Sequence, residues 1–152
     1  MSAAHVHLLF NHVPVLGTLF GLLLLLLGLP RKSDDVARAG LLGLVLVALA
    51  TLPAYLSGEG AERLVRPLAG ISTLVMEEHE EAALPAMLAV EGVGVLALYG
   101  LVLGRGGRRV PRFLLFTVIG GSALAFAFVV RAANLGGQVH HPEIRSDTAP
   151  RT

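Results

Sequence analysis

Six histidines give this chain its widest range of chemistry, and three of them stand near the N-terminus. His5, His7 and His12, together with Asn11, lie at the start of an apolar run that ends near Leu29. An imidazole can bind a metal ion or a haem iron, or exchange a proton near neutral pH. Polar groups just inside a membrane span are costly and usually have partners. We therefore expect His12 to turn inward and His7 to lie close by.

The second histidine group surrounds His79, in the segment Met76-Glu-Glu-His-Glu-Glu81. Four neighbouring carboxylates favour the protonated imidazole and can orient its ring. Acidic residues are also common at the start of a helix, which is the structural interpretation of the same segment. Because His12 and His79 are predicted at similar membrane depth, we expect them to approach each other or a shared ligand.

Two glycine-containing segments are predicted to turn the backbone across the same site. In Ser57-Gly-Glu-Gly-Ala-Glu62 the glycines would turn the chain and present Glu59 and Glu62. Gly136-Gly137 would return the chain towards the bundle and bring His140 and His141 with it.

A further set of polar residues lies within or beside the apolar segments. Glu91 is about 13 Å below the start of its span at ~1.5 Å per residue, and an intramembrane carboxylate is a functional candidate. It could carry a proton, line a quinone pocket, or pair with His12 or Arg131. Asn11, Arg131 and Asn134 are the other candidates for this pocket.

The elements that must position these residues are four hydrophobic segments. The chain has 152 residues, of which 54% are hydrophobic, a composition typical of a small integral membrane protein. Each segment is long enough to cross a bilayer, which takes about 20 residues. The predicted spans are about 8–29, 36–57, 82–104 and 113–133. We expect an all-α, antiparallel bundle of four transmembrane helices in one domain, residues 1–144, followed by a flexible polar tail, residues 145–152.

The distribution of charge predicts the orientation. The two short connections and their flanks carry seven basic residues (Arg31, Lys32, Arg38, Arg105, Arg108, Arg109 and Arg112) against Asp34 and Asp35. Basic short loops stay in the cytoplasm. Both termini and all six histidines are therefore expected outside, which for a bacterial inner-membrane protein is the periplasm.

Composition also excludes several functions. The chain has no cysteine, which excludes disulfides, thiolate metal sites, iron–sulfur clusters and covalently attached haem. A net charge of +1 favours no nucleic-acid partner.

Four motifs together carry a resemblance to a known family. They are His7-Leu-Leu-Phe-Asn-His-Val-Pro14, Tyr55-Leu-Ser-Gly-Glu-Gly-Ala-Glu62, His79-Glu-Glu-Ala82 and Gly136-Gly-Gln-Val-His140. With these motifs the chain resembles bacterial four-helix membrane proteins related to the family described as domain of unknown function 2231, over nearly its whole length up to Ile144. The resemblance implies one site built from the four motifs. It also implies redox partners, because members occur beside Rieske or cytochrome c modules. It implies no particular reaction.

The leading functional prediction is a membrane-bound b-type cytochrome, an electron carrier or a subunit of a redox complex rather than a stand-alone enzyme. Histidines projecting from helices into a bundle hold non-covalent haem. His12 and His79 are the predicted axial pair, with His7 and His140 as alternatives. A quinol and a periplasmic cytochrome c or Rieske protein are the predicted redox partners, and a homo-oligomer is compatible with the sequence.

Three alternatives stay open. The first is a non-haem site for zinc, copper or iron, drawing on His7, His12, His79, His140, His141, Glu59 and Glu62. The second is a structural subunit whose histidines dock a partner. The third is a proton-coupled transporter.

Overall fold

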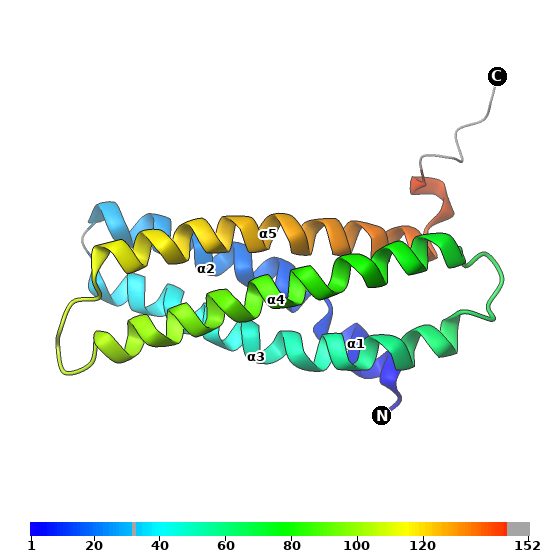
Figure 1. Ribbon diagram of the computed structural model, residues 1–152, viewed down its shortest axis with the longest axis horizontal. Helices are drawn as coiled ribbons and strands as arrows, with labels where there is room; N and C mark the ends of the chain where they lie inside the picture. The colour runs from blue at the N-terminus through cyan, green and yellow to red at the C-terminus, as the bar shows by residue number, and fades with distance from the viewer. Residues whose placement is uncertain (32, 146–152) are drawn as a thin grey trace, which may run out of the picture.

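The computed structural model describes residues 1–31 and 33–145, and within them it is entirely helical. The elements are α1 (Ala3–Phe10), α2 (Val13–Arg31), α3 (Asp34–Val65), α4 (Thr73–Leu103), α5 (Arg112–His140) and the short 3₁₀ helix η1 (Pro142–Ile144) (Figure 1). The predicted all-α class is confirmed. Lys32, and the predicted tail beyond Arg145, lie outside the described residues.

Four helical stretches are long and apolar enough to cross a membrane, as predicted: Ala3–Arg31, Asp34–Val65, Thr73–Leu103 and Arg112–His140. With 32 residues, α3 is about 48 Å long at ~1.5 Å per residue, which exceeds the ~30 Å hydrocarbon core. The charged ends of α3 and α4, which carry Glu59–Arg66 and Glu77–Glu81, therefore project beyond their apolar parts.

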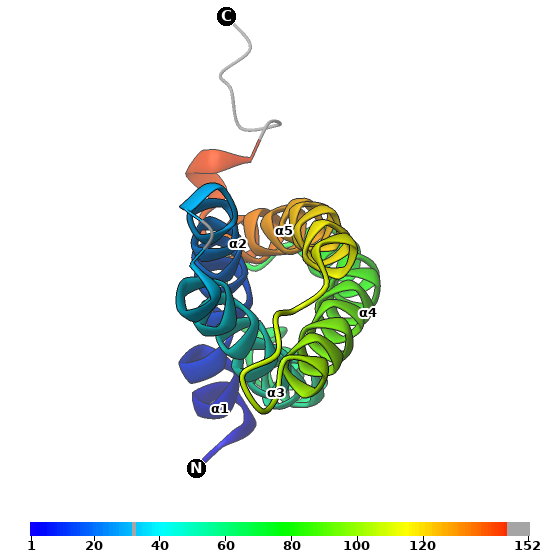
Figure 2. The same ribbon diagram turned by 90° about the vertical axis from the view of Figure 1, so that its left-hand side faces the viewer.

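The four long helices form a ring in which each lies beside two others. α2 packs against α3, α3 against α4, α4 against α5, and α5 against α2, while α1 packs against α3 (Figures 1 and 2). We call the end with α1, the α3–α4 connection and η1 the histidine end. The opposite end, with the α2–α3 and α4–α5 connections, is the arginine end.

Small residues lie at close helix contacts, beside buried leucines such as Leu41 and Leu44, and many large apolar residues lie on the outside. Gly17 of α2 faces Val47 so closely that a Cβ at position 17 would clash, and Gly94 of α4 meets Ala48 in the same way. Large exposed side chains include Phe20, Leu46, Leu88, Val95 and Phe116. Inside a membrane no hydrophobic effect drives helices together. Small residues at the contacts allow the helices to pack closely there.

The first predicted span is two helices rather than one. α1 ends at Phe10 and α2 begins at Val13, so Asn11 and His12 lie in a break. Pro14 stands in the first turn of α2, where a backbone donor is not needed. The sequence predicts a distortion beside His12 from this proline, and the break lies there.

The two predicted glycine turns are wrong, because both segments are helical. α3 continues through Gly58 and Gly60 to Val65, and α5 continues through Gly136 and Gly137 to His140. The α3–α4 connection is accordingly only residues 66–72. At these positions, glycine allows a neighbouring helix or side chain to approach closely. A Cβ at position 60 would lie 2.6 Å from the Ala3 Cβ, and one at position 136 would lie 3.1 Å from the His79 ring.

Candidate functional site

His79 is, with His7, one of the two histidines of the described chain that are partly buried. It projects from the first turns of α4, a helix capped by Ser72, whose hydroxyl accepts a bond from the Val75 amide. The Nδ1 of His79 lies 2.8 Å from the carbonyl oxygen of Ala132 on α5. A carbonyl can only accept, so Nδ1 carries the proton and donates. In the neutral ring, Nε2 then keeps a free lone pair.

Burial keeps the His79 imidazole neutral. Removal from water lowers the pKa of His79, and this effect outweighs the hydrogen bond to Ala132, which acts in the opposite direction. The ring also lies against the backbone of Gly136, 3.1 Å from the position a Cβ would take there. A side chain at position 136 would therefore push the ring away from α5.

His7 on α1 repeats this arrangement against a different helix. Its Nδ1 lies 2.9 Å from the carbonyl oxygen of Ala54 on α3, so Nδ1–H again donates and Nε2 is left free. The two rings are close enough to interact, because a charge on His7 disfavours a charge on His79. Two imidazoles, each anchored through Nδ1 to a helix carbonyl, thus share the histidine end.

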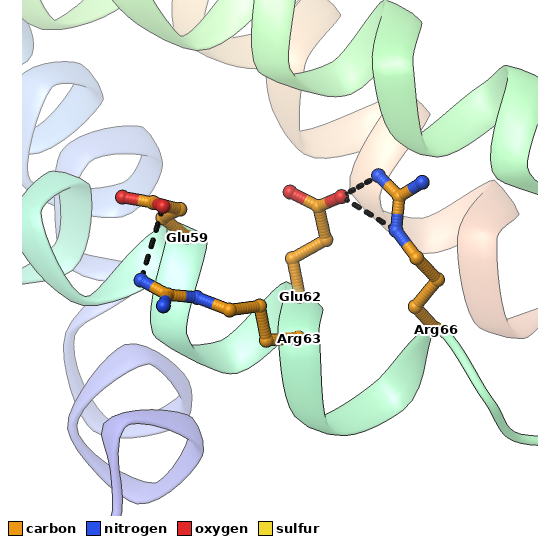
Figure 3. A network of polar contacts seen from close by, with 4 residues as sticks. All are labelled: Glu59, Glu62, Arg63 and Arg66. Carbon is orange, nitrogen blue, oxygen red and sulfur yellow. Dashed lines mark hydrogen bonds and ion pairs between the residues drawn. The ribbon is translucent and has the colours of Figure 1, made fainter.

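The carboxylates beside these rings form their own network. Arg63 donates to Glu59 at 3.0 Å, and Arg66 donates twice to Glu62 (Figure 3). Figure 3 shows both pairs on the last turns of α3, one turn apart. Glu59 and Glu62 are therefore paired with arginines of their own helix.

Glu80 on α4 and Glu62 on α3 influence each other's pKa, as two carboxyl groups do when they come within hydrogen-bonding reach. Two carboxyl groups can share a hydrogen bond only if one carries a proton. The interaction with Glu62, together with burial, raises the pKa of Glu80 to about 7, while the same interaction and Arg66 lower the pKa of Glu62. Glu62 further interacts with His79. This end of the bundle therefore has a proton that can be exchanged near neutral pH.

His12 does not turn inward as predicted, because it lies in the break after α1 and is exposed. The predicted approach of His12 to His79 stays a prediction. The expectation assumed one continuous first helix, whereas α1 leaves the line of α2 to pack on α3. His7, predicted as an alternative, is the histidine whose charge acts on His79.

The remaining histidines lie apart from this pair. His5 pairs with the hydroxyl of Ser2 at 2.7 Å, and His141 pairs with Glu143 at 2.9 Å. Both His140 and His141 are exposed, because α5 continues straight to His140 and does not fold back over the bundle.

The intramembrane pocket candidates do not form one site. Glu91 is partly buried, and its Oε1 has no hydrogen-bond partner among the described residues. The predicted pairing of Glu91 with His12 or Arg131 is therefore not formed, and Arg131 and Asn134 are exposed. Asn11 has a buried Oδ1 that also lacks a partner in the described chain.

A bare metal site fits this arrangement poorly. Across residues 1–31 and 33–145, no three or more His, Asp or Glu side chains are grouped to hold a metal ion. Three contributors could not be predicted from residue types: the carbonyls of Ala54 and Ala132, and Gly136 as a ring contact. Glu80 could be, because it is next to His79 in the acidic segment.

No protein-family model, curated protein or solved structure matches the chain. The resemblance carried by the four motifs stays a prediction.

Proposed function

We propose that this chain is a membrane-bound b-type haem protein that carries electrons, with His7 and His79 as the axial ligands. The observation that supports this proposal is the shared geometry of the two rings. Each donates Nδ1–H to a backbone carbonyl, at 2.9 Å for His7 and 2.8 Å for His79, and keeps Nε2 free. Ligating histidines are usually held in this tautomer by such an outer bond.

The number of available donors favours haem over a bare metal ion. A b-type haem needs one or two axial imidazoles, because the macrocycle supplies the other ligands. A structural or catalytic zinc site takes three or four protein ligands. Two free imidazoles on α1 and α4 satisfy the first requirement and not the second. When bound, haem would supply one-electron chemistry.

The residues of the chain would hold the group and manage protons. His7 and His79 would orient the ligand through α3 and α5, and the Glu62–Glu80 pair would take up or release a proton beside it. That arrangement suits a quinol as electron donor and a cytochrome c or Rieske protein as acceptor. The family resemblance, carried by segments that include both histidines, supports the same redox role.

We also propose an antiparallel bundle in a bacterial inner membrane with both termini in the periplasm. The arginine end then faces the cytoplasm, as basic short loops do. The histidine end faces the periplasm, where soluble electron carriers could reach it.

An absorption spectrum of the detergent-purified full chain, expressed with ample haem, tests the function. We expect a Soret band and an α-band that appears on reduction with dithionite. His79→Ala and His7→Ala should each remove the low-spin spectrum, while the exposed His12→Ala, the matched control, should keep it. Helical content by circular dichroism establishes that each variant folds.

Two results would contradict the proposal. A colourless wild-type protein would leave a structural subunit as the better hypothesis. Loss of the spectrum in His12→Ala alone would mean that the ligand pair is assigned wrongly.

A further inference from the structure

A cavity at the arginine end lies far from the histidines and is independent of the haem proposal. It has a volume of about 280 Å³ and is enclosed by the end of α2, the start of α3 and the start of α5. Its apolar lining includes Leu29, Val110 and Leu115. Its polar lining includes the charged side chains Arg109 and Arg112. Apolar and cationic groups therefore line the same cavity at the arginine end of the bundle.

The loop that forms one wall is held in a defined shape. Gly106 and Gly107 have φ values of 65° and 77°, a left-handed conformation that glycine adopts without strain. The guanidinium of Arg38 on α3 donates to the carbonyl of Gly104 at 2.6 Å and to that of Arg108 at 2.8 Å. Arg109 is the next residue after Arg108, and Arg112 begins α5. Both side chains therefore extend from backbone that is held in place.

One of the two arginine side chains that line the cavity is available to bind an anion. Asp34 is the acidic residue of the lining, and it already pairs with Arg109 at 3.4 Å. The side chain of Arg112 has no hydrogen bond or ion pair with any residue that the structure describes. It also begins α5, whose N-cap, Pro111, provides no side-chain cap. The positive end of the helix dipole therefore adds to the charge of Arg112.

We propose that this cavity binds the phosphate of an anionic phospholipid headgroup, with Arg112 as the principal cation and Arg109 beside it. An arginine side chain binds phosphate through two parallel N–H bonds. Basic pockets between transmembrane helices are suited to such headgroups. Phe116, one turn after Arg112 on the same helix face, is 58% exposed and could support an acyl chain. The apolar part of the lining favours a lipid over free inorganic phosphate, because only a lipid has apolar groups to place against it.

The test is native mass spectrometry of the full chain in detergent, titrated with phosphatidylglycerol, phosphatidylcholine or inorganic phosphate. We expect one saturable phosphatidylglycerol molecule and no comparable binding of phosphatidylcholine. Arg112→Gln should weaken phosphatidylglycerol binding about tenfold, the effect of losing one charge-assisted contact. The matched control is Arg105→Gln, an exposed arginine of the same loop that does not line the cavity. It should change binding less than about twofold.

Three outcomes would overturn the proposal. Equal losses in Arg105→Gln and Arg112→Gln would mean diffuse attraction by the whole arginine end. Equal binding of phosphatidylcholine would exclude charge recognition. Inorganic phosphate that fully displaces phosphatidylglycerol at similar concentration would make the cavity a free-phosphate site rather than a lipid site.

Discussion

The rings of His7 and His79 are held in place by groups that have no side-chain chemistry of their own. The partner of each Nδ1 is the carbonyl of an alanine, Ala54 or Ala132. Because Gly136 has no side chain, the His79 ring can lie against α5. Both contributions come from the backbone, so they depend on where the helices are and not on which residue types are present.

The shared proton of Glu62 and Glu80 predicts a pH dependence of stability. The pKa of Glu80 is raised from 4.5 to about 7 in the folded chain. The folded state therefore binds this proton more tightly than the unfolded state. Its stabilising contribution is complete below the unfolded pKa and is lost as the pH rises through about 7.

We expect Glu80→Gln to hydrogen-bond Glu62 without needing a proton. The thermal midpoint of the wild type should fall between pH 5 and pH 8 by more than that of Glu80→Gln, measured in one detergent. Glu78→Gln, an exposed glutamate of the same turns, is the control and should follow the wild type. Parallel curves for wild type and Glu80→Gln would show that the pair shares no proton.

At the scale of elements, the decisive feature is the separation of α1 from α2. Because α1 packs against α3, His7 reaches the carbonyl of Ala54 and His12 is left exposed in the break. The contact depends on Gly60, where a Cβ would lie 2.6 Å from the Ala3 Cβ. A continuous first helix would present a different set of histidines to the bundle.

Gly60→Val should therefore displace α1 and weaken the His7 contact. Overpacking of this kind costs about 1–3 kcal/mol. We expect a lower thermal midpoint and faster proteolysis within the first ten residues. The matched control is Gly43→Val on the same helix, because a Cβ at position 43 meets nothing within 4 Å. If both variants behave alike, α1 is not held through Gly60.

At the scale of the whole molecule, the two ends of the bundle differ in chemistry. The arginine end contains the cavity lined by Arg109 and Arg112, and the histidine end contains the two anchored imidazoles and the acidic network. In the proposed orientation, the proposed lipid site faces the cytoplasm and the proposed haem site faces the periplasm.

Reporter fusions test this orientation. We expect a fusion at Gly106 to report the cytoplasm and a fusion after Thr152 to report the periplasm, because the short connections are basic. Two reporters, one active on each side, provide the control for expression. The reverse pattern would place the histidine end in the cytoplasm and exclude periplasmic electron carriers as partners.

The sequence by itself determined the class of the protein and its four long apolar helices. Length and hydropathy are local properties, and in a bilayer every backbone polar group must be satisfied within its own segment, so a long apolar run forms a helix. His79 was also identifiable, because it stands between four glutamates at the start of an apolar segment.

Which histidine of the first segment is held inside the bundle was decided only by the tertiary structure. His7 and His12 are five residues apart, and nothing local distinguishes them. The break at Asn11 and His12, and the packing of α1 on α3 through Gly60, direct one ring inward and leave the other exposed. Likewise, Gly58, Gly60 and Gly136 are expected in turns by residue type, but they lie inside helices. Glycine permits both a turn and a close contact, and only the position of the neighbouring helix determines which one is formed.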